Sequence, residues 1–182
     1  EVGRGPLAGP VTAAAVILDP QSIPQGLNDS KKLTARRRAE IADDIWLMAQ
    51  VAVAHASVSE IDELNILRAS HLAMQRAIDE LPQRPDHVLI DGNMIPRGLK
   101  ISAETIVKGD ARSLSIAAAS IVAKVARDRI MCALAADFPG YGWDSNAGYP
   151  SKAHKMALQS LGVTPHHRRS FKPVYNILYP EK

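Results

Sequence analysis

Hydrophobic and polar residues follow two different periods along this chain, and the changes of period divide it into predicted strands and helices. Residues 11–18, VTAAAVIL, form a short apolar run that ends at Asp19-Pro20, which is typical of a strand. Similar short runs predict further strands over residues 51–57, 87–91 and 101–107.

Apolar residues at helical spacing predict helices between and after these strands. Thr34 is a candidate N-cap for a helix that ends near residue 50, and Ser59 is a candidate N-cap for one helix that continues to residue 81. An alanine-rich segment predicts the longest helix, over residues 113–138, which Pro139 ends. We expect a last helix near residues 151–162, followed by an irregular or partly helical end.

This order of elements predicts an α/β fold, with a mixed β-sheet flanked by helices and a small helical region at the C-terminus. The length of 182 residues suits one compact unit. Within it we expect a catalytic core over residues 1–140 and a basic, helical, substrate-binding extension over residues 141–182. Nothing in the sequence requires more than a monomer.

Composition excludes several classes of protein. No apolar run reaches the length of a membrane span, so we expect no membrane partner. The one cysteine, Cys132, excludes an internal disulfide and is expected to be a buried packing residue. These features favour a reducing, cytoplasmic location.

The net charge is only +3, but the charges are unevenly distributed. No Asp or Glu occurs from Ser145 to Pro180, whereas five basic residues do: Lys152, Lys155, Arg168, Arg169 and Lys172. A basic tail on a nearly balanced body indicates a polyanionic partner, or else a merely solvated surface.

Three carboxylates stand in settings unlike those of surface acids. Glu1 precedes a Gly-Arg-Gly turn, Asp91 ends an apolar strand, and Asp110 follows Lys108-Gly109 just before a helix. Carboxylates without cysteine suit a hard cation such as Mg²⁺ or Mn²⁺, and two such ions can activate a water and stabilise a leaving oxygen. From spacing alone, Asp91-Gly92 fits an ordinary turn equally well.

A set of ordered motifs is more specific than any of these signals. EVGRGPLAGPV, LNDSKKLT, IDELNIL, LIDGN, KGDARSLSIAAASIVAKVARD, GYP and HHRRSF follow one another along the chain. Together they closely resemble the bacterial ribonuclease HII family, the type 2 ribonucleases H.

The resemblance implies a ribonuclease H-like fold and an endoribonuclease. Its substrates would be RNA–DNA hybrids and duplex DNA that contains single ribonucleotides, cut on the 5′ side of the ribonucleotide. Two Mg²⁺ or Mn²⁺ ions would support hydrolysis, leaving 3′-hydroxyl and 5′-phosphate ends. The implied catalytic and metal-binding residues are Glu1, Asp91 and Asp110. The family pattern also has an Asp directly before Glu1, so we expect the printed chain to begin one residue late.

The same motifs imply residues that bind the substrate. Gly3, Arg4 and Gly5 would read the 2′-hydroxyl, and Tyr149 would stack on the sugar that follows the ribonucleotide. Candidate phosphate contacts are Asn28, Ser30, Lys31, Lys108, Ser113, Arg168 and Arg169. The adjacent His166 and His167 are a poor metal pair. Arg127 and Asp128 are expected to form ion pairs that fix the long helix.

Two other functions remain open at this stage. Without the Asp before Glu1, the chain would be a catalytically impaired nucleic-acid binder. A strand-processing nuclease of the same fold, such as a resolvase, suits the acids but does not explain the Gly-Arg-Gly turn together with Tyr149.

Overall fold

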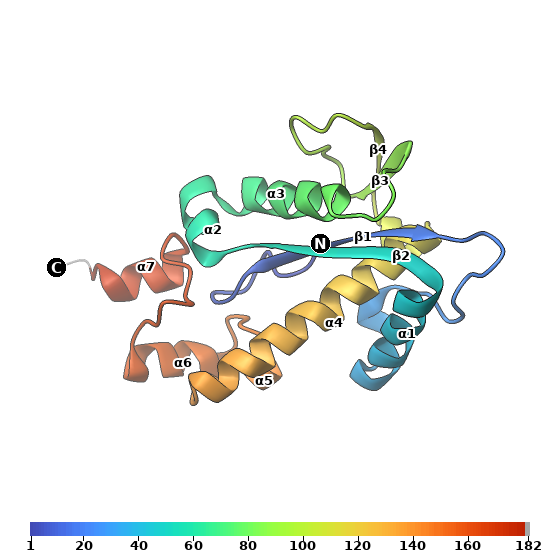
Figure 1. The fold of residues 1–182 in the computed structure, drawn as a ribbon. Coiled ribbons are helices and arrows are strands. Elements are labelled where there is room, and N and C mark those ends of the chain that lie inside the picture. Colours follow the sequence, from blue (N-terminus) through green and yellow to red (C-terminus); the bar gives the residue numbers. More distant parts are fainter. Residues whose placement is uncertain (181–182) are drawn as a thin grey trace.

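The computed structural model describes residues 1–180, and its helices and strands form an α/β fold (Figure 1). In chain order they are β1 (Val11–Leu18), η1 (Ser30–Lys32), α1 (Ala35–Met48), β2 (Ala49–Ala56), α2 (Val58–Leu64), α3 (Ile66–Asp79), β3 (His87–Asp91), β4 (Ser102–Ile106), η2 (Gly109–Ala111), α4 (Leu114–Asp137), α5 (Trp143–Asn146), α6 (Lys152–Leu161) and α7 (Lys172–Leu178).

The strands run in both directions, as a mixed sheet requires, but within the described residues they form two separate ladders. β1 and β2 are antiparallel, with Val11 opposite Ala56 and Leu18 opposite Ala49. β3 and β4 are parallel. Residues from both β1 and β3 line a cavity of about 700 Å³, so the two ladders meet at this space.

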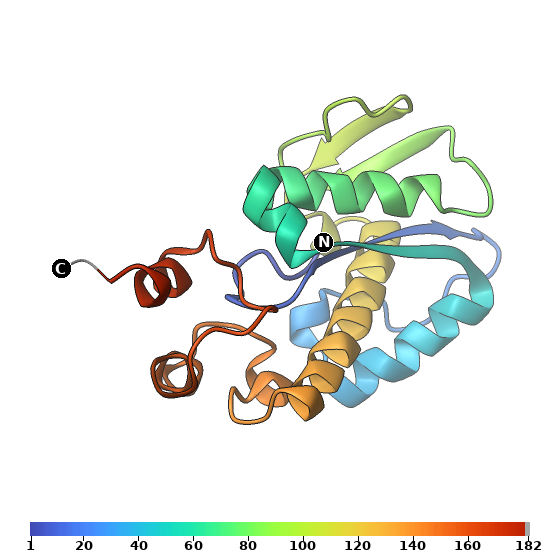
Figure 2. The ribbon, with the colours of Figure 1, turned by 60° about the vertical axis from the view of Figure 1, so that its left-hand side comes forward.

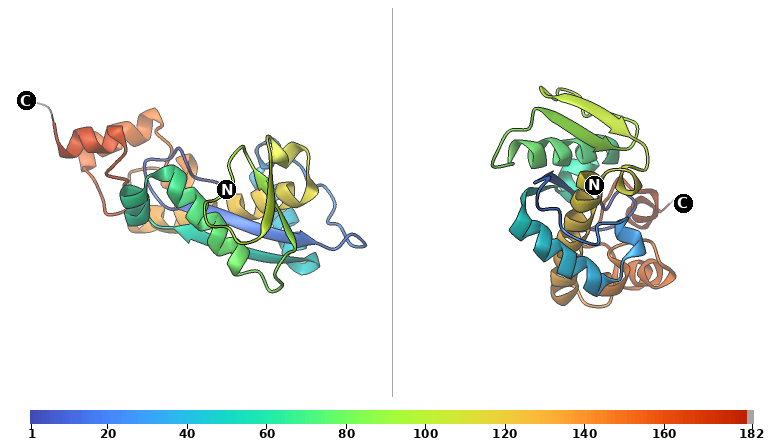
Figure 3. Two further views of the ribbon diagram at one scale, coloured as in Figure 1. Left: turned by 90° about the horizontal axis from the view of Figure 1, so that it is seen from above. Right: turned by 90° about the vertical axis from the view of Figure 1, so that its right-hand side faces the viewer.

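The alternation along β1 explains how helices cover both faces of the β1–β2 ladder (Figures 1 and 3). Successive strand residues point to opposite faces. Val11 and Ala13 pack with the alanines of α3 on one face. On the other face, Ala14 and Val16 pack against a cluster that α1 and α4 supply. Small side chains in the strands and in α3 therefore allow the helix and the ladder to approach closely.

The prediction of one continuous helix from Ser59 to residue 81 is wrong. It is broken into α2 and α3 at Asn65, which adopts a left-handed φ of 71°. The Asn65 side chain accepts hydrogen bonds from the amides of Leu67 and Arg68, so it caps α3. The N-cap of α2 is Ser57 rather than Ser59, and it forms a capping box with Glu60.

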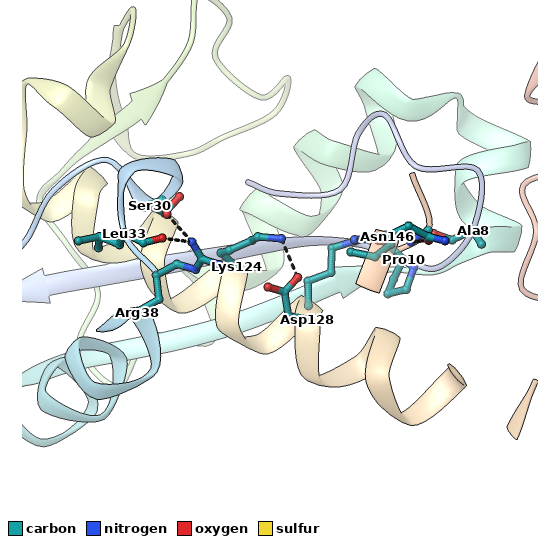
Figure 4. Close-up of polar contacts among 11 residues, drawn as sticks. Ala8, Pro10, Ser30, Leu33, Arg38, Lys124, Asp128 and Asn146 are labelled. Carbon is teal, nitrogen blue, oxygen red and sulfur yellow. Dashed lines mark hydrogen bonds and ion pairs between the residues drawn. The ribbon is translucent and has the colours of Figure 1, made fainter. Parts of the chain in front are cut away.

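Two side chains of α4 also differ from the expectations. Cys132 is exposed, because it follows the fully buried Met131 and faces outward. Asp128 does form an ion pair, with Lys124 at 2.7 Å, as Figure 4 shows. Arg127 instead donates hydrogen bonds to backbone carbonyls.

The C-terminal segment packs against the N-terminal loop and α4. Ala8, Met131, Tyr141, Trp143 and Ala157 form one hydrophobic cluster. Helices α6 and α7 lie beyond it, at one end of the molecule (Figure 2). Among the described residues, no helix is long and apolar enough to cross a membrane.

Candidate active site

Asp91 and Asp110 are linked through one backbone hydrogen bond. Asp91 lies at the C-terminal end of β3, and its Oδ1 accepts a 2.8 Å hydrogen bond from the amide of Gly109. Gly109 has no room for a side chain, since an added Cβ would lie 2.5 Å from Ile116 Cδ1 and 3.2 Å from Asp91 Oδ1. The turn that carries Asp110 is therefore docked directly on Asp91.

Glu1 reaches the same region from the start of the chain. An antiparallel bridge between Val2 and Thr12 holds it beside β1. Its side chain is 14% exposed and forms an ion pair with Arg4 at 3.6 Å. Glu1, Asp91 and Ser113 all line the 700 Å³ cavity between the two ladders. The structure thus places two of the three predicted carboxylates around one space, and the third in the turn that docks on Asp91.

The donor chemistry of these residues fits a hard divalent cation, because all three offer carboxylate oxygens. The three carboxylates are not close enough together to form a complete set of metal ligands. Within residues 1–180, no three His, Cys, Asp or Glu side chains gather closely enough to hold a metal ion. Glu1, Asp91 and Asp110 therefore form a carboxylate-lined region rather than a closed ligand set.

The Gly-Arg-Gly turn and Tyr149 lie together, although 144 positions separate Gly5 from Tyr149 in the sequence. Gly3 has a φ of +93°, and an added Cβ there would overlap the guanidinium of Arg127. An added Cβ at Gly5 would lie 3.4 Å from Tyr149 Cε1, so the ring packs over this glycine. Tyr149 remains 42% exposed. Its ring and the turn form one accessible surface.

Comparison with known families identifies the family to which this chain belongs. The family model described as "Ribonuclease HII" matches residues 1–174. The chain belongs to the ribonuclease HII family. It is therefore a metal-dependent endoribonuclease, of a family that acts on RNA–DNA hybrids.

Individual relatives agree with membership in the ribonuclease HII family. A ribonuclease HII of Ruegeria sp. (strain TM1040) is 71% identical over 181 residues, covering 100% of this chain and 79% of the relative. The crystal structure of ribonuclease H2 from Pyrococcus horikoshii OT3 has a TM-score of 0.80 at 26% identity, covering 97% and 93% of the two chains. Bst-RNase HIII, solved in complex with Mn²⁺, has a TM-score of 0.80 at 20% identity, covering 98% and 67%, and shows the shared fold.

The loop that carries Asn28, Ser30 and Lys31 is held as a capping structure in this ribonuclease HII family member. Asn28 Oδ1 accepts from the amide of Asp29, and Asp29 in turn caps η1. Arg38 donates to the carbonyls of Ser30 and Leu33, both at 2.7 Å (Figure 4). Ser30 is buried, whereas Asn28 and Lys31 are exposed and face solvent.

Lys108 and Ser113 flank Asp110. Lys108 is exposed and adopts a left-handed φ of 56°. The hydroxyl of Ser113 caps α4 by accepting from the amide of Ile116, and it also shares a 3.0 Å hydrogen bond with Ser115. The cap at Ser113 fixes the direction in which α4 leaves the Asp110 turn.

The expectation that Arg168 contacts the DNA backbone is wrong. Its side chain is fully buried and donates hydrogen bonds to carbonyls of the N-terminal loop. Arg169 is exposed, and its amide donates to Asp62 at 3.0 Å. Asp62 also accepts from the amide and hydroxyl of Ser170, so it anchors the start of the C-terminal segment. Of the two arginines, only Arg169 is available to a ligand in this state.

A buried histidine pair supports the Tyr149 loop, and sequence reasoning missed it. Trp143 Nε1 donates to His154 Nε2 at 3.1 Å, so His154 carries its proton on Nδ1 and donates to the carbonyl of Tyr149 at 2.9 Å. His167 Nε2 lies 3.1 Å from His154 Nε2, and its Nδ1 accepts from the amide of Thr164 at 3.0 Å and lies 2.9 Å from the Thr164 hydroxyl. Both rings are neutral, and burial lowers the pKa of both, that of His167 to about 4.

Sequence reasoning also did not identify Arg127 as a residue that supports the site. A signal for it exists, because Arg127 lies one helical turn from Met131 and six residues after Ile121, on the buried face of α4. A charged residue on an apolar helix face requires buried partners. The sequence could not show that these partners are carbonyls of the loop before β1.

Proposed function

We propose that this chain hydrolyses a phosphodiester bond on the 5′ side of a ribonucleotide, both in RNA–DNA hybrids and at single ribonucleotides within duplex DNA. The proposal deepens the family activity by naming the substrate position. What supports it is the contact between Gly5 and the exposed ring of Tyr149, in a turn whose Arg4 pairs with Glu1, which itself lines the cavity.

The Gly3–Gly5 turn suits recognition of ribose. Only contact with the 2′-hydroxyl separates RNA from DNA at a single nucleotide. Arg4 and Gly5 are exposed, so a sugar can approach the backbone polar groups of the turn closely. The Tyr149 ring offers an apolar face on which the neighbouring sugar packs. This combination favours a junction where a ribonucleotide is followed by DNA. A resolvase does not need to recognise ribose, so its activity would not explain the turn together with Tyr149.

Glu1, Asp91 and Asp110 would hold Mg²⁺ or Mn²⁺. Once bound, such ions supply Lewis-acid activation of a water and stabilise the departing 3′ oxygen. The products of that reaction carry 3′-hydroxyl and 5′-phosphate ends. Asp91 also holds the Asp110 turn through Gly109, so it orients its own neighbour in the site.

The exposed basic residues supply phosphate contacts away from the reacting bond. Lys31, Lys108 and Arg169 face solvent, and residues 141–182 carry no acid before Glu181 except Asp144. We assign to this segment the role of a substrate-binding extension of the core, residues 1–140. Contacts of this kind position a duplex without reading its sequence.

The test uses Asp91→Asn and Asp110→Asn, assayed on a labelled duplex with one ribonucleotide in Mg²⁺, in Mn²⁺ and in EDTA. Each variant keeps the size of the side chain but removes a charge that a cation needs, so cleavage should fall by at least about a hundredfold while the fold persists. Arg36→Gln, on an exposed face of α1, is the matched charge-removal control. Unchanged turnover in either Asp variant would contradict the metal assignment.

A further inference from the structure

Two fully buried arginines, Arg127 and Arg168, donate hydrogen bonds to backbone carbonyls of the N-terminal loop. Arg168 donates to the carbonyl oxygens of Gly3 at 2.6 Å and Arg4 at 3.0 Å. It also donates to Gly9, at 3.0 Å from Nε and 2.8 Å from Nη2, and to Pro10 at 3.2 Å. One guanidinium thus ties together both ends of the loop that contains the Gly-Arg-Gly turn.

Arg127 connects the same loop to the segment that carries Tyr149. Its guanidinium donates to Ala8 at 3.0 Å and to Pro10 at 2.9 Å. Its third hydrogen bond, at 2.8 Å, goes to the carbonyl of Ala147, two residues before Tyr149. Figure 4 shows Ala8, Pro10 and Asn146, the neighbour of Ala147, gathered at one place beside α4. The turn and the tyrosine therefore share a support.

These charges have no carboxylate partner. Within residues 1–180, neither Arg127 nor Arg168 forms an ion pair. Burial, and then the nearby charge of Arg127, lower the pKa of Arg168 to about 9, so it remains protonated at neutral pH. A buried charge needs compensation, and here the carbonyl oxygens of the loop provide it. The loop carbonyls are thereby held inward.

The direction of the carbonyls decides where the amides point. Every peptide bond is trans among the described residues, and in a trans peptide the C=O and the following N–H point in opposite directions. Since the carbonyls of Gly3 and Arg4 point inward to Arg168, the amides of Arg4 and Gly5 point outward. Both residues are exposed, and neither amide donates to another group within residues 1–180. Two successive outward amides form a concave donor pair for an oxygen-rich ligand.

We propose that Arg168, assisted by Arg127, is a positioning residue for ribonucleotide recognition: it holds the Gly3 and Arg4 carbonyls inward, so that the Arg4 and Gly5 amides face the 2′-hydroxyl and its adjoining phosphate. The inference rests on the proposed function, because it assumes that this turn reads the ribose. It replaces the role of direct phosphate contact expected of Arg168 with one that acts through the backbone.

The test measures discrimination rather than stability. Arg168→Lys retains a positive charge but loses the planar fork that reaches four carbonyls. The dissociation constants of two duplexes that differ in one 2′-hydroxyl are measured with EDTA present, so that no cleavage occurs. We expect the ratio of the two constants to fall by about tenfold in Arg168→Lys, which corresponds to the loss of about one hydrogen bond to the 2′-hydroxyl.

Arg76→Lys is the matched control. Arg76 also donates to a backbone carbonyl, that of His55 at 2.8 Å, but it lies on α3 and pairs with Glu60 of α2. It should lower the melting temperature and leave the ratio unchanged. If Arg168→Lys fails to fold, Arg127→Lys takes its place, since it frees the same loop.

Each outcome has a distinct meaning. A ratio near one for the unchanged chain would contradict the proposed reading of the 2′-hydroxyl itself. A ratio that is well above one in the unchanged chain, and that persists in a folded Arg168→Lys or Arg127→Lys variant, would overturn only the positioning role.

Discussion

Acid should destabilise this protein through His167, and the structure gives the size of the effect. The ring is 1% exposed, and its Nδ1 accepts a hydrogen bond from the amide of Thr164, with the Thr164 hydroxyl 2.9 Å away. Burial, followed by the charges of His154 and His166, lowers the pKa from 6.5 to about 4. A proton on Nδ1 would remove the only acceptor that Thr164 faces there and would leave a charge in an apolar cluster.

The sign follows from the two pKa values. In the unfolded chain His167 takes up a proton below about pH 6.5, whereas in the folded chain it does so only near pH 4. The unfolded state therefore binds more protons between these values, and stability falls as the pH is lowered through that window. The pKa difference corresponds to a loss of about 2 kcal/mol between about pH 7 and about pH 5. The lowered pKa values of His154 and His55 act in the same direction.

The assay is urea unfolding at several pH values, for the unchanged chain and for His167→Gln. The variant will be less stable near pH 7, because it loses packing and hydrogen bonds. Its decrease in unfolding free energy between about pH 7 and about pH 5 should be smaller by about 2 kcal/mol, since His167 no longer titrates. Equal pH dependence in the two proteins would refute the assignment of a neutral, buried His167.

Three further substitutions test separate parts of the site. Tyr149→Ala should reduce cleavage at a single ribonucleotide in DNA more than cleavage of a continuous hybrid, and equal losses in kcat/KM on the two substrates would indicate a structural role alone. Gly109→Ala should lower kcat by about tenfold or more, because a Cβ 2.5 Å from Ile116 Cδ1 displaces the amide that holds Asp91; an unchanged kcat would show that this link is dispensable. Asp62→Ala should lower the unfolding free energy by about 1–3 kcal/mol in urea titrations, because it leaves the amides of Arg169 and Ser170 without their acceptor. An unchanged unfolding free energy would show that Asp62 does not anchor the C-terminal segment.

Local signals in the sequence predicted most of the helices and strands. The strand at Val11–Leu18 and the long helix at Leu114–Asp137 lie where apolar periodicity and proline boundaries put them. The break at Asn65 was not predictable from periodicity, because the apolar pattern continues through it. The left-handed conformation of Asn65 is instead fixed by its own capping hydrogen bonds.

The candidate site was predictable only as far as its chemistry depends on local motifs. The sequence placed Asp91 at a strand end and Asp110 in the turn before a helix, and both lie there. Charge alone suggested that Arg168 meets a polyanion. Its burial depends on carbonyls more than 150 positions away, which no local pattern encodes.

The most direct measurement compares two labelled DNA duplexes that differ in one sugar, ribose against deoxyribose, incubated with the protein in Mg²⁺ or Mn²⁺. The account predicts one cut, on the 5′ side of the ribonucleotide, with 3′-hydroxyl and 5′-phosphate ends, and no cut in the all-DNA duplex or in EDTA. Equal cleavage of both duplexes, or a cut that persists in EDTA, would contradict it.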